Sequence, residues 1–161
     1  MKKWILPVIA LSLLCWPAQA QPMAGERGEA TLDLGGAKVT VEYGRPELKG
    51  RDPESLISPG DEWRMGSNAA TTLSTDADLK FGDKLVPKGK YVLRAKFVEK
   101  GTWHLKILKE DKSVVAEIPL KYHQASTSEE LVTVKLEKQG SGGKFTLQWG
   151  KLTISANFQK A

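Results

Sequence analysis

Residues 91–108, YVLRAKFVEKGTWHLKIL, decide the fold class of this chain. Apolar and polar residues alternate on both sides of the turn signal Glu99-Lys100-Gly101. Alternation with a period of two places apolar side chains on one face of a strand and polar ones on the other. The stretch therefore predicts a β-hairpin with one buried face.

The same period of two recurs through most of the chain. Further strands are predicted around residues 39–43, 79–81, 114–120, 132–136, 145–149 and 152–158. Pro119 is expected to end one of them, and Gly150 to turn the chain between the last two. Helical periodicity is nearly absent, apart from one possible turn at residues 52–57. We predict an all-β domain, an antiparallel β-sandwich of about eight or nine short strands, with a β-barrel as the alternative.

The first twenty residues have the three parts of a cleavable secretory signal in order. Met1-Lys2-Lys3 is basic, residues 4–16 are apolar, and Ala18-Gln19-Ala20 is a small-x-small cleavage site. An apolar run of about thirteen residues is too short to span a bilayer core, which argues against an uncleaved transmembrane anchor. We expect a periplasmic or secreted protein. Its predicted parts are a signal peptide at 1–20, a loose lead-in at 21–30 and a single domain at 31–161.

Removal of the signal would change which chemistry the chain can use. Cys15 is the only cysteine, so the predicted mature chain has no disulfide and no thiolate nucleophile. Lys2 and Lys3 would also leave, which brings the formal net charge of +5 closer to zero. Because charges of both signs are interleaved along the chain, we do not expect nucleic-acid binding.

Residues 43–72 interrupt the strand pattern and form the candidate site. The candidate ligand-binding residues in this stretch are Arg45, Arg51, Trp63, Arg64, Asn68 and Thr71. In the functional interpretation, the three arginines converge on a pocket. The Asn68 amide and the Thr71 hydroxyl add hydrogen bonds, and the Trp63 indole provides a stacking surface. Such a pocket would suit an anion, a carboxylate or a sugar. The alternative is structural: the tryptophan plugs the core, and the arginines brace a long loop by binding backbone carbonyls.

The same stretch carries a resemblance to a known family. The order of residues Tyr43-x-Arg45-Pro46, Lys49-Gly50-Arg51 and Trp63-Arg64-x-Gly66-x-Asn68-x-Ala70-Thr71, followed by Val86-Pro87-x-Gly89-x-Tyr91, resembles the bacterial domain-of-unknown-function family 2911. This resemblance implies a secreted or envelope β-rich domain without an established biochemical role. Ala69 stands where the family usually carries a glutamate, so no mechanism that needs that carboxylate is expected here.

Catalytic patterns are sparse. The two histidines, His104 on a predicted strand facing solvent and His123 in a predicted loop, lack the close spacing of a metal site. No Gly-x-Ser-x-Gly nucleophile motif is present. We therefore predict no catalytic residue, no metal and no cofactor.

The favoured function is a non-catalytic module that binds a small anionic or carbohydrate ligand, or a protein partner, through residues 43–72. One alternative is an envelope assembly protein that pairs through a strand edge. The other is a hydrolase with its site in the same loop, and a serine or carboxylate bonded to either histidine would favour it.

The predicted cleavage site can be tested directly. We expect the protein recovered from the periplasm or the medium to begin at Gln21, and an Ala20→Arg chain to keep its first twenty residues, because the cleavage site requires a small residue there. N-terminal sequencing and intact mass measure both. Ala24→Arg, which lies beyond the site, is the control and should be processed normally. A wild-type protein that still begins at Met1 would contradict the prediction.

Overall fold

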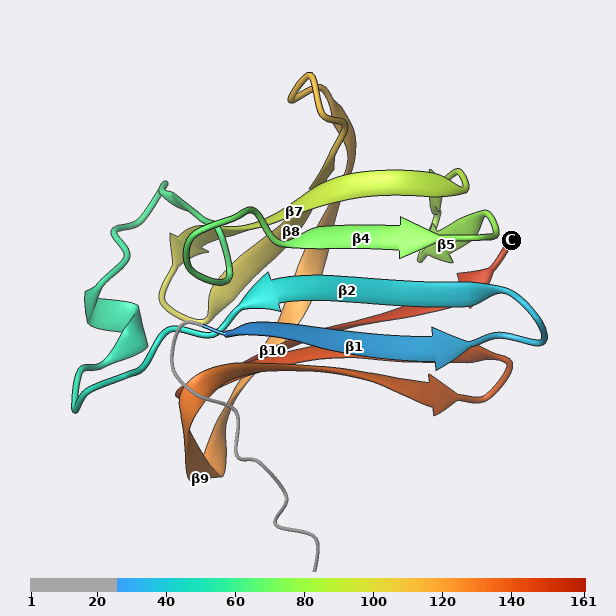
Figure 1. Cartoon of the computed structure of the whole chain (residues 1–161). Coiled ribbons are helices and arrows are strands. Elements are labelled where there is room, and N and C mark those ends of the chain that lie inside the picture. Colours follow the sequence, from blue (N-terminus) through green and yellow to red (C-terminus); the bar gives the residue numbers. More distant parts are fainter. Residues whose placement is uncertain (1–25) are drawn as a thin grey trace, which may run out of the picture.

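The computed structural model describes residues 26–161, so the predicted signal lies outside the described residues (Figure 1). Of the described residues, 66% are in strands. The one helical turn among the described residues is the 3-10 turn η1 (Pro53–Ser55), which Asp52 caps by accepting a hydrogen bond from the backbone N–H of Glu54. The all-β prediction is confirmed.

Ten strands form one antiparallel sheet. They are β1 (Arg27–Asp33), β2 (Lys38–Gly44), β3 (Glu62–Trp63), β4 (Thr72–Thr75), β5 (Leu79–Phe81), β6 (Lys84–Val86), β7 (Gly89–Glu99), β8 (Thr102–Leu108), β9 (Val114–Gln139) and β10 (Gly142–Lys160). Their order is β1-β2-β4-β7-β8-β9-β10-β5-β6, and β3 pairs with β7. The sheet is not closed, so the barrel alternative is wrong.

The two longest strands, β9 and β10, fold the sheet over itself into a sandwich. The first part of β9 pairs with β8, where Leu120 lies opposite Trp103. Its later part pairs with β10, where Val134 lies opposite Leu147. Figure 1 shows β10 crossing behind β1 and β2. Both layers contribute to the core, and one small interior void is lined by Val41, Leu73, Leu93 and Leu105 together with Phe81, Leu136, Phe145 and Phe158.

Pro119 does not end a strand, contrary to prediction. β9 runs through it, and Pro119 lies opposite His104 of β8. The pairing of β10 with β9 stops at Ser155 opposite Lys121, so Pro119 lies beyond the part of β9 that β10 flanks. A proline without an N–H is tolerated where a strand edge is unpaired.

Gly150 does not turn the chain between two short strands either. It lies inside β10 with a φ of 58°, between two register shifts that mark a bulge. Residues 145–148 therefore pair with β9 rather than with residues 152–158. A left-handed residue bends the strand without ending it, so eight or nine predicted short strands become ten, two of them long.

Part of the predicted lead-in belongs to the sheet. Residues 27–30 are the first half of β1, which pairs with β2 from Arg27 opposite Gly44 onward. Only Ala30 of this strand is buried, so its sequence has almost no apolar alternation. The neighbouring strand, rather than local periodicity, determines its conformation.

The segment between β2 and β4 packs tightly against the end of the sandwich. A Cβ atom on Gly44 would lie 2.1 Å from the carbonyl oxygen of Ser67 and 2.6 Å from its nitrogen. A Cβ atom on Gly66 would lie 2.9 Å from backbone atoms of Gly44. Two backbones meet here with no space for a side chain, so both positions need glycine.

Gly44→Ala should therefore destabilise the protein strongly. We expect a loss of about 3 kcal/mol or more, because the added methyl group meets backbone that cannot rotate away. Gly36→Ala is the matched control: its φ of 88° carries strain, but no atom lies within 4 Å of the added methyl group, so we expect about 1–2 kcal/mol. Urea unfolding measures both, and equal losses would contradict the packing argument.

Candidate functional site

Residues 45–71 wrap around one end of the sandwich. The first part attaches to β9, where the backbone N–H of Leu48 donates to the carbonyl of Glu130 at 2.8 Å. The middle part, with Leu48 and Pro53, covers the bend of β10 at Gly150. The last part, β3, pairs with β7. The segment is therefore an end cap attached to three strands of the sheet.

The three candidate arginines bind oxygen atoms in three separate places. Arg45 Nε donates to Val132 O (3.1 Å) and Nη2 to Thr133 Oγ1 (3.3 Å); Arg51 Nε donates to Leu48 O (2.9 Å) and Nη2 to Glu47 O (2.9 Å); Arg64 Nη1 donates to Asn68 O (3.4 Å). Four of these five acceptors are backbone carbonyls, and no acceptor is shared. These bonds support the bracing interpretation of the arginines.

Arg27 braces the segment in the same way. Its Nη1 donates to Ala69 O at 3.1 Å, and its Nη2 donates to Ala70 O at 3.0 Å. Sequence reasoning missed this residue because it fell within the predicted lead-in. Its guanidinium joins β1 to a part of the segment more than forty residues away, and only pairing of β1 with β2 brings the two together.

Trp63 belongs to an aromatic cluster. Its ring stacks on Trp149 with centroids 5.6 Å apart and an interplanar angle of 15°, and it meets Trp103 edge-on at 6.4 Å. Trp103 and Trp149 are buried, and Trp63 packs against the core. Such aromatic pairs add stability beyond the area they bury, which supports the core-plug interpretation of Trp63.

Asn68 and Thr71 lie in different environments. Asn68 is exposed and has a left-handed φ of 63°, a conformation that asparagine tolerates better than most residues. Thr71 is 1% exposed, and its carbonyl accepts a hydrogen bond from Leu93. The Thr71 hydroxyl has no hydrogen-bond partner within residues 26–161. At such burial, Thr71 does not face a ligand in solvent.

A cavity of about 290 Å³ opens where β9 and β10 bend, and we name it the corner cavity. It is lined by Leu48, Arg51, Asp52, Pro53, Glu54, Gln124, Ser128, Gly150, Lys151 and Leu152. Arg51 is the one predicted site residue among them. The others come from η1 and the residues before it, from a part of β9 expected to be a loop, and from the bend of β10, and no sequence spacing connects these three parts.

The corner cavity carries charges of both signs. Arg51 and Lys151 are cationic, and Asp52 and Glu54 are anionic. Glu54 Oε2 accepts hydrogen bonds from Tyr122 Oη at 2.9 Å and Gln124 Nε2 at 3.1 Å. Its other oxygen, Oε1, is buried and has no hydrogen-bond partner in the described part of the chain. Burial raises the pKa of Tyr122, and the neighbouring charge of Glu54 adds to that rise, so the tyrosine remains a donor at neutral pH.

His104 is half-buried rather than fully solvent-facing. Its Nδ1 lies 2.9 Å from Glu117 Oε1, and Lys106 beside it binds Glu62. The hydrogen bond with His104 lowers the pKa of Glu117, against the opposing effect of burial, and the charges of Lys96 and Lys106 lower it further. This pair lies on the outer face of the sheet and does not border the corner cavity.

His123 lies in β9 opposite Thr153, and not in a loop as predicted. Within residues 26–161, neither histidine has a hydrogen bond to a serine. No group of three or more histidine, cysteine or carboxylate side chains in this range is arranged to hold a metal ion. No helix in the same range is long and apolar enough to cross a membrane.

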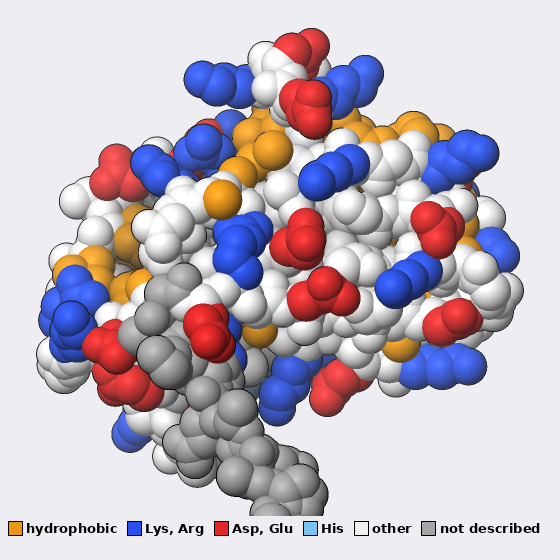
Figure 2. Space-filling view, viewed as in Figure 1, with side chains coloured by type: hydrophobic (Ala, Val, Ile, Leu, Met, Phe, Trp, Pro, Cys, Tyr) orange, Lys and Arg blue, Asp and Glu red, His pale blue; other side chains and the backbone are white. Residues whose placement is uncertain are grey.

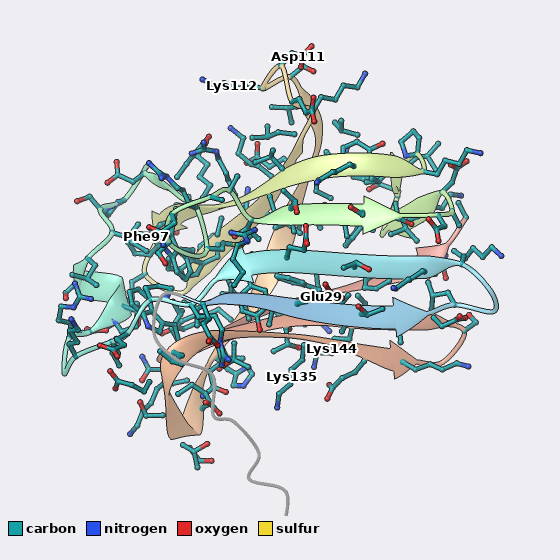
Figure 3. The ribbon with its side chains drawn as sticks, viewed as in Figure 1. Glu29, Phe97, Asp111, Lys112, Lys135 and Lys144 are labelled. Carbon is teal, nitrogen blue, oxygen red and sulfur yellow. The ribbon has the colours of Figure 1, made fainter. Side chains whose placement is uncertain are left out.

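The surface charge is mixed. Figure 2 shows Lys and Arg side chains interspersed with Asp and Glu across one face, without a patch of a single sign. In Figure 3, Glu29 lies on β1, and Lys135 and Lys144 lie on the adjoining β9 and β10. Interspersed charges of both signs are typical of a solvated protein surface.

Comparison with known protein families matches residues 26–158 to one family, described as a protein of unknown function, DUF2911. No curated protein and no solved structure shows significant similarity to the chain. The match confirms the resemblance that the motifs between Tyr43 and Tyr91 indicated.

The His104–Glu117 pair predicts a pH-dependent contribution to stability. Because the pKa of Glu117 is lowered in the folded state, the contribution is present above the ordinary glutamate pKa of about 4.3 and is lost as pH falls through the lower folded value. Glu117→Gln should cost less than about 1 kcal/mol at pH 7, since the carboxylate is partly exposed. Urea unfolding at pH 7, 4 and 3 should show the wild-type advantage shrinking. Glu137→Gln is the control, and an advantage independent of pH would contradict the assignment.

Proposed function

The chain belongs to the DUF2911 family of proteins of unknown function, and from this premise we propose that it is an exported, non-catalytic module that binds a small polar ligand in the corner cavity. The observation that carries the proposal is the composition of that cavity. It gathers two cations, two carboxylates, an amide and a hydroxyl around a volume of about 290 Å³. Small-ligand sites are concave and hold a few convergent polar groups of this kind.

The cavity is built from parts that fix its polar groups. Arg51 is held by two carbonyls of its own turn, and Glu54 by Tyr122 and Gln124. Side chains held in this way lose little conformational entropy when a ligand binds, which favours affinity. In this proposal Arg51 is the binding arginine, while Arg45 and Arg64 stabilise the end cap.

Export rests on the signal at residues 1–20, whose basic, apolar and small-x-small parts stand in the required order. A domain without cysteine outside that signal folds without disulfides, so its stability depends on the core of the sandwich. This is compatible with either the periplasm or the medium.

The edges of the sheet argue against an assembly role. β1 carries Arg27, Glu29 and Asp33 along its length, and β6 has only three residues. Charged and very short edge strands are devices that prevent pairing with another chain. A binding role through a cavity therefore fits the structure better than strand addition.

The hydrolase alternative has one observation in its favour. A carboxylate bonded to Nδ1 of a histidine, as Glu117 is to His104, orients the imidazole as in catalytic dyads. Two lysines flank this pair on an open strand face, and no hydroxyl nucleophile binds the histidine within residues 26–161. We therefore place it second.

A thermal-shift screen of the exported protein tests the binding proposal. The panel contains amino acids, short carboxylates, sugars, phosphate and divalent metal salts. A ligand at one hundred times its dissociation constant should stabilise the protein by about 2.7 kcal/mol. Lys151→Glu, which reverses one cavity charge, should abolish the shift, and Lys135→Glu on β9 is the matched control. A hit lost with His104→Gln but kept with Lys151→Glu would favour the hydrolase alternative, and a screen without any hit would refute the binding role.

A further inference from the structure

The corner cavity has equal numbers of positive and negative side chains, and this balance limits the class of ligand that fits it. A site for a simple anion would present cations, and a site for a simple cation would present carboxylates. The corner cavity presents both, Arg51 and Lys151 with Asp52 and Glu54. The complement of such a site is a molecule that itself carries both signs.

Asp52 and Glu54 are the groups that would attract a cation. Both donors to the Glu54 carboxylate, Tyr122 and Gln124, act on Oε2 and are neutral, and neutral donors compensate a carboxylate less than a charged donor does. The other oxygen, Oε1, is buried, so Glu54 acts on a ligand through its charge and not through a direct bond from Oε1. Asp52 is exposed; its Oδ1 accepts from the backbone N–H of Glu54 at 3.1 Å, and its carboxylate adds a second negative charge to the cavity. The two carboxylates together favour an ammonium group on this side of the cavity.

Arg51 and Lys151 are the groups that would bind a carboxylate. The hydrogen bonds of Arg51 use Nε and Nη2, which fixes the plane of the guanidinium. Lys151 is exposed and follows the bend residue Gly150. A planar guanidinium and an exposed ammonium group together suit a carboxylate, because hydrogen bonds between charged groups are about twice as strong as those between neutral groups.

The apolar part of the cavity wall is aliphatic. Leu48, Pro53 and Leu152 line it, and no aromatic ring does. A sugar would find no stacking surface there, whereas a small aliphatic side chain would find apolar contacts.

We infer that the corner cavity binds a zwitterion, an α-amino acid with an aliphatic side chain, with its ammonium group toward Glu54 and its carboxylate toward Arg51 and Lys151. This inference rests on the proposed binding function and adds the ligand class to it. If the cavity recognises both the ammonium group and the carboxylate of the ligand, removing either charge from the ligand should weaken binding.

Leucine, N-acetylleucine and leucinamide test the inference on the wild-type protein. The first carries both charges, the second lacks the ammonium group, and the third lacks the carboxylate. Calorimetry should show binding of leucine and a loss of affinity of about ten-fold or more for each derivative. Amide resonances of residues 48–54, 124–128 and 150–152 should shift with leucine.

Two substitutions assign the charges. Glu54→Gln should weaken leucine binding about ten-fold or more and remove the discrimination against N-acetylleucine, while Lys151→Gln should reduce the discrimination against leucinamide. Glu137→Gln and Lys135→Gln, both on exposed positions of β9, are the matched controls and should leave binding unchanged. If Glu54→Gln fails to fold, the wild-type comparison of the three ligands still decides.

Two further outcomes distinguish a wrong ligand class from a wrong binding function. If glucose or phosphate shifts the same amide resonances and leucine does not, the zwitterion is wrong and the corner cavity remains a binding site. If no compound shifts them, both the ligand class and the binding role are overturned. Equal binding of leucine and its two derivatives also overturns the inference.

Discussion

The bend of β9 and β10 is the constraint on which the rest of the structure depends. β10 bends at Gly150, whose left-handed φ of 58° lies between two register shifts. Residues on either side of the bend belong to different layers, so one open sheet becomes a sandwich with a shared core. A straight β10 would leave one apolar face of the sheet in water, at a cost of roughly 25 cal/mol for each Å² exposed.

The end cap depends on the same bend. Leu48 and Pro53 lie against Gly150, and Trp63 stacks on the adjacent Trp149. Arginines then tie the cap to backbone carbonyls at several points, with Arg27 and Arg45 spanning long separations in sequence. Apolar contacts stabilise the end cap against the sandwich, and the arginine hydrogen bonds, whose geometry is fixed, determine the course of its backbone. Gly44 and Gly66 allow the close approach that completes it.

The candidate site is a consequence of this architecture. A bulged strand departs from regular pairing, and bulges often lie beside functional sites because they re-aim side chains. Here the bend separates β9 from β10 and leaves the corner cavity between them and η1. Glu54, presented by a capped turn, meets Tyr122 and Gln124 of β9 there. Gln124 and Ser128 come from β9, Lys151 comes from β10, and Arg51 and Asp52 precede η1.

The fold class could be predicted from the amino-acid sequence, because alternation like that at residues 91–108 indicates a half-buried strand. The sequence also determined the family through the motifs between Tyr43 and Tyr91, and it located the segment that contributes Arg51 to the cavity. Other features depend on contacts between distant parts of the chain and could not be predicted from local sequence. Pro119 and Gly150 have the residue types of strand ends, yet both lie inside strands, because one lies on an unpaired edge and the other at a bulge. Three of the four charged residues of the corner cavity lie together at residues 51–54, but Lys151 comes from a segment almost one hundred residues away, and no sequence spacing relates the two parts. Only the folding of the sheet over itself brings them to one place, since side-chain convergence across a bend is a property of the packed layers and not of any stretch of sequence.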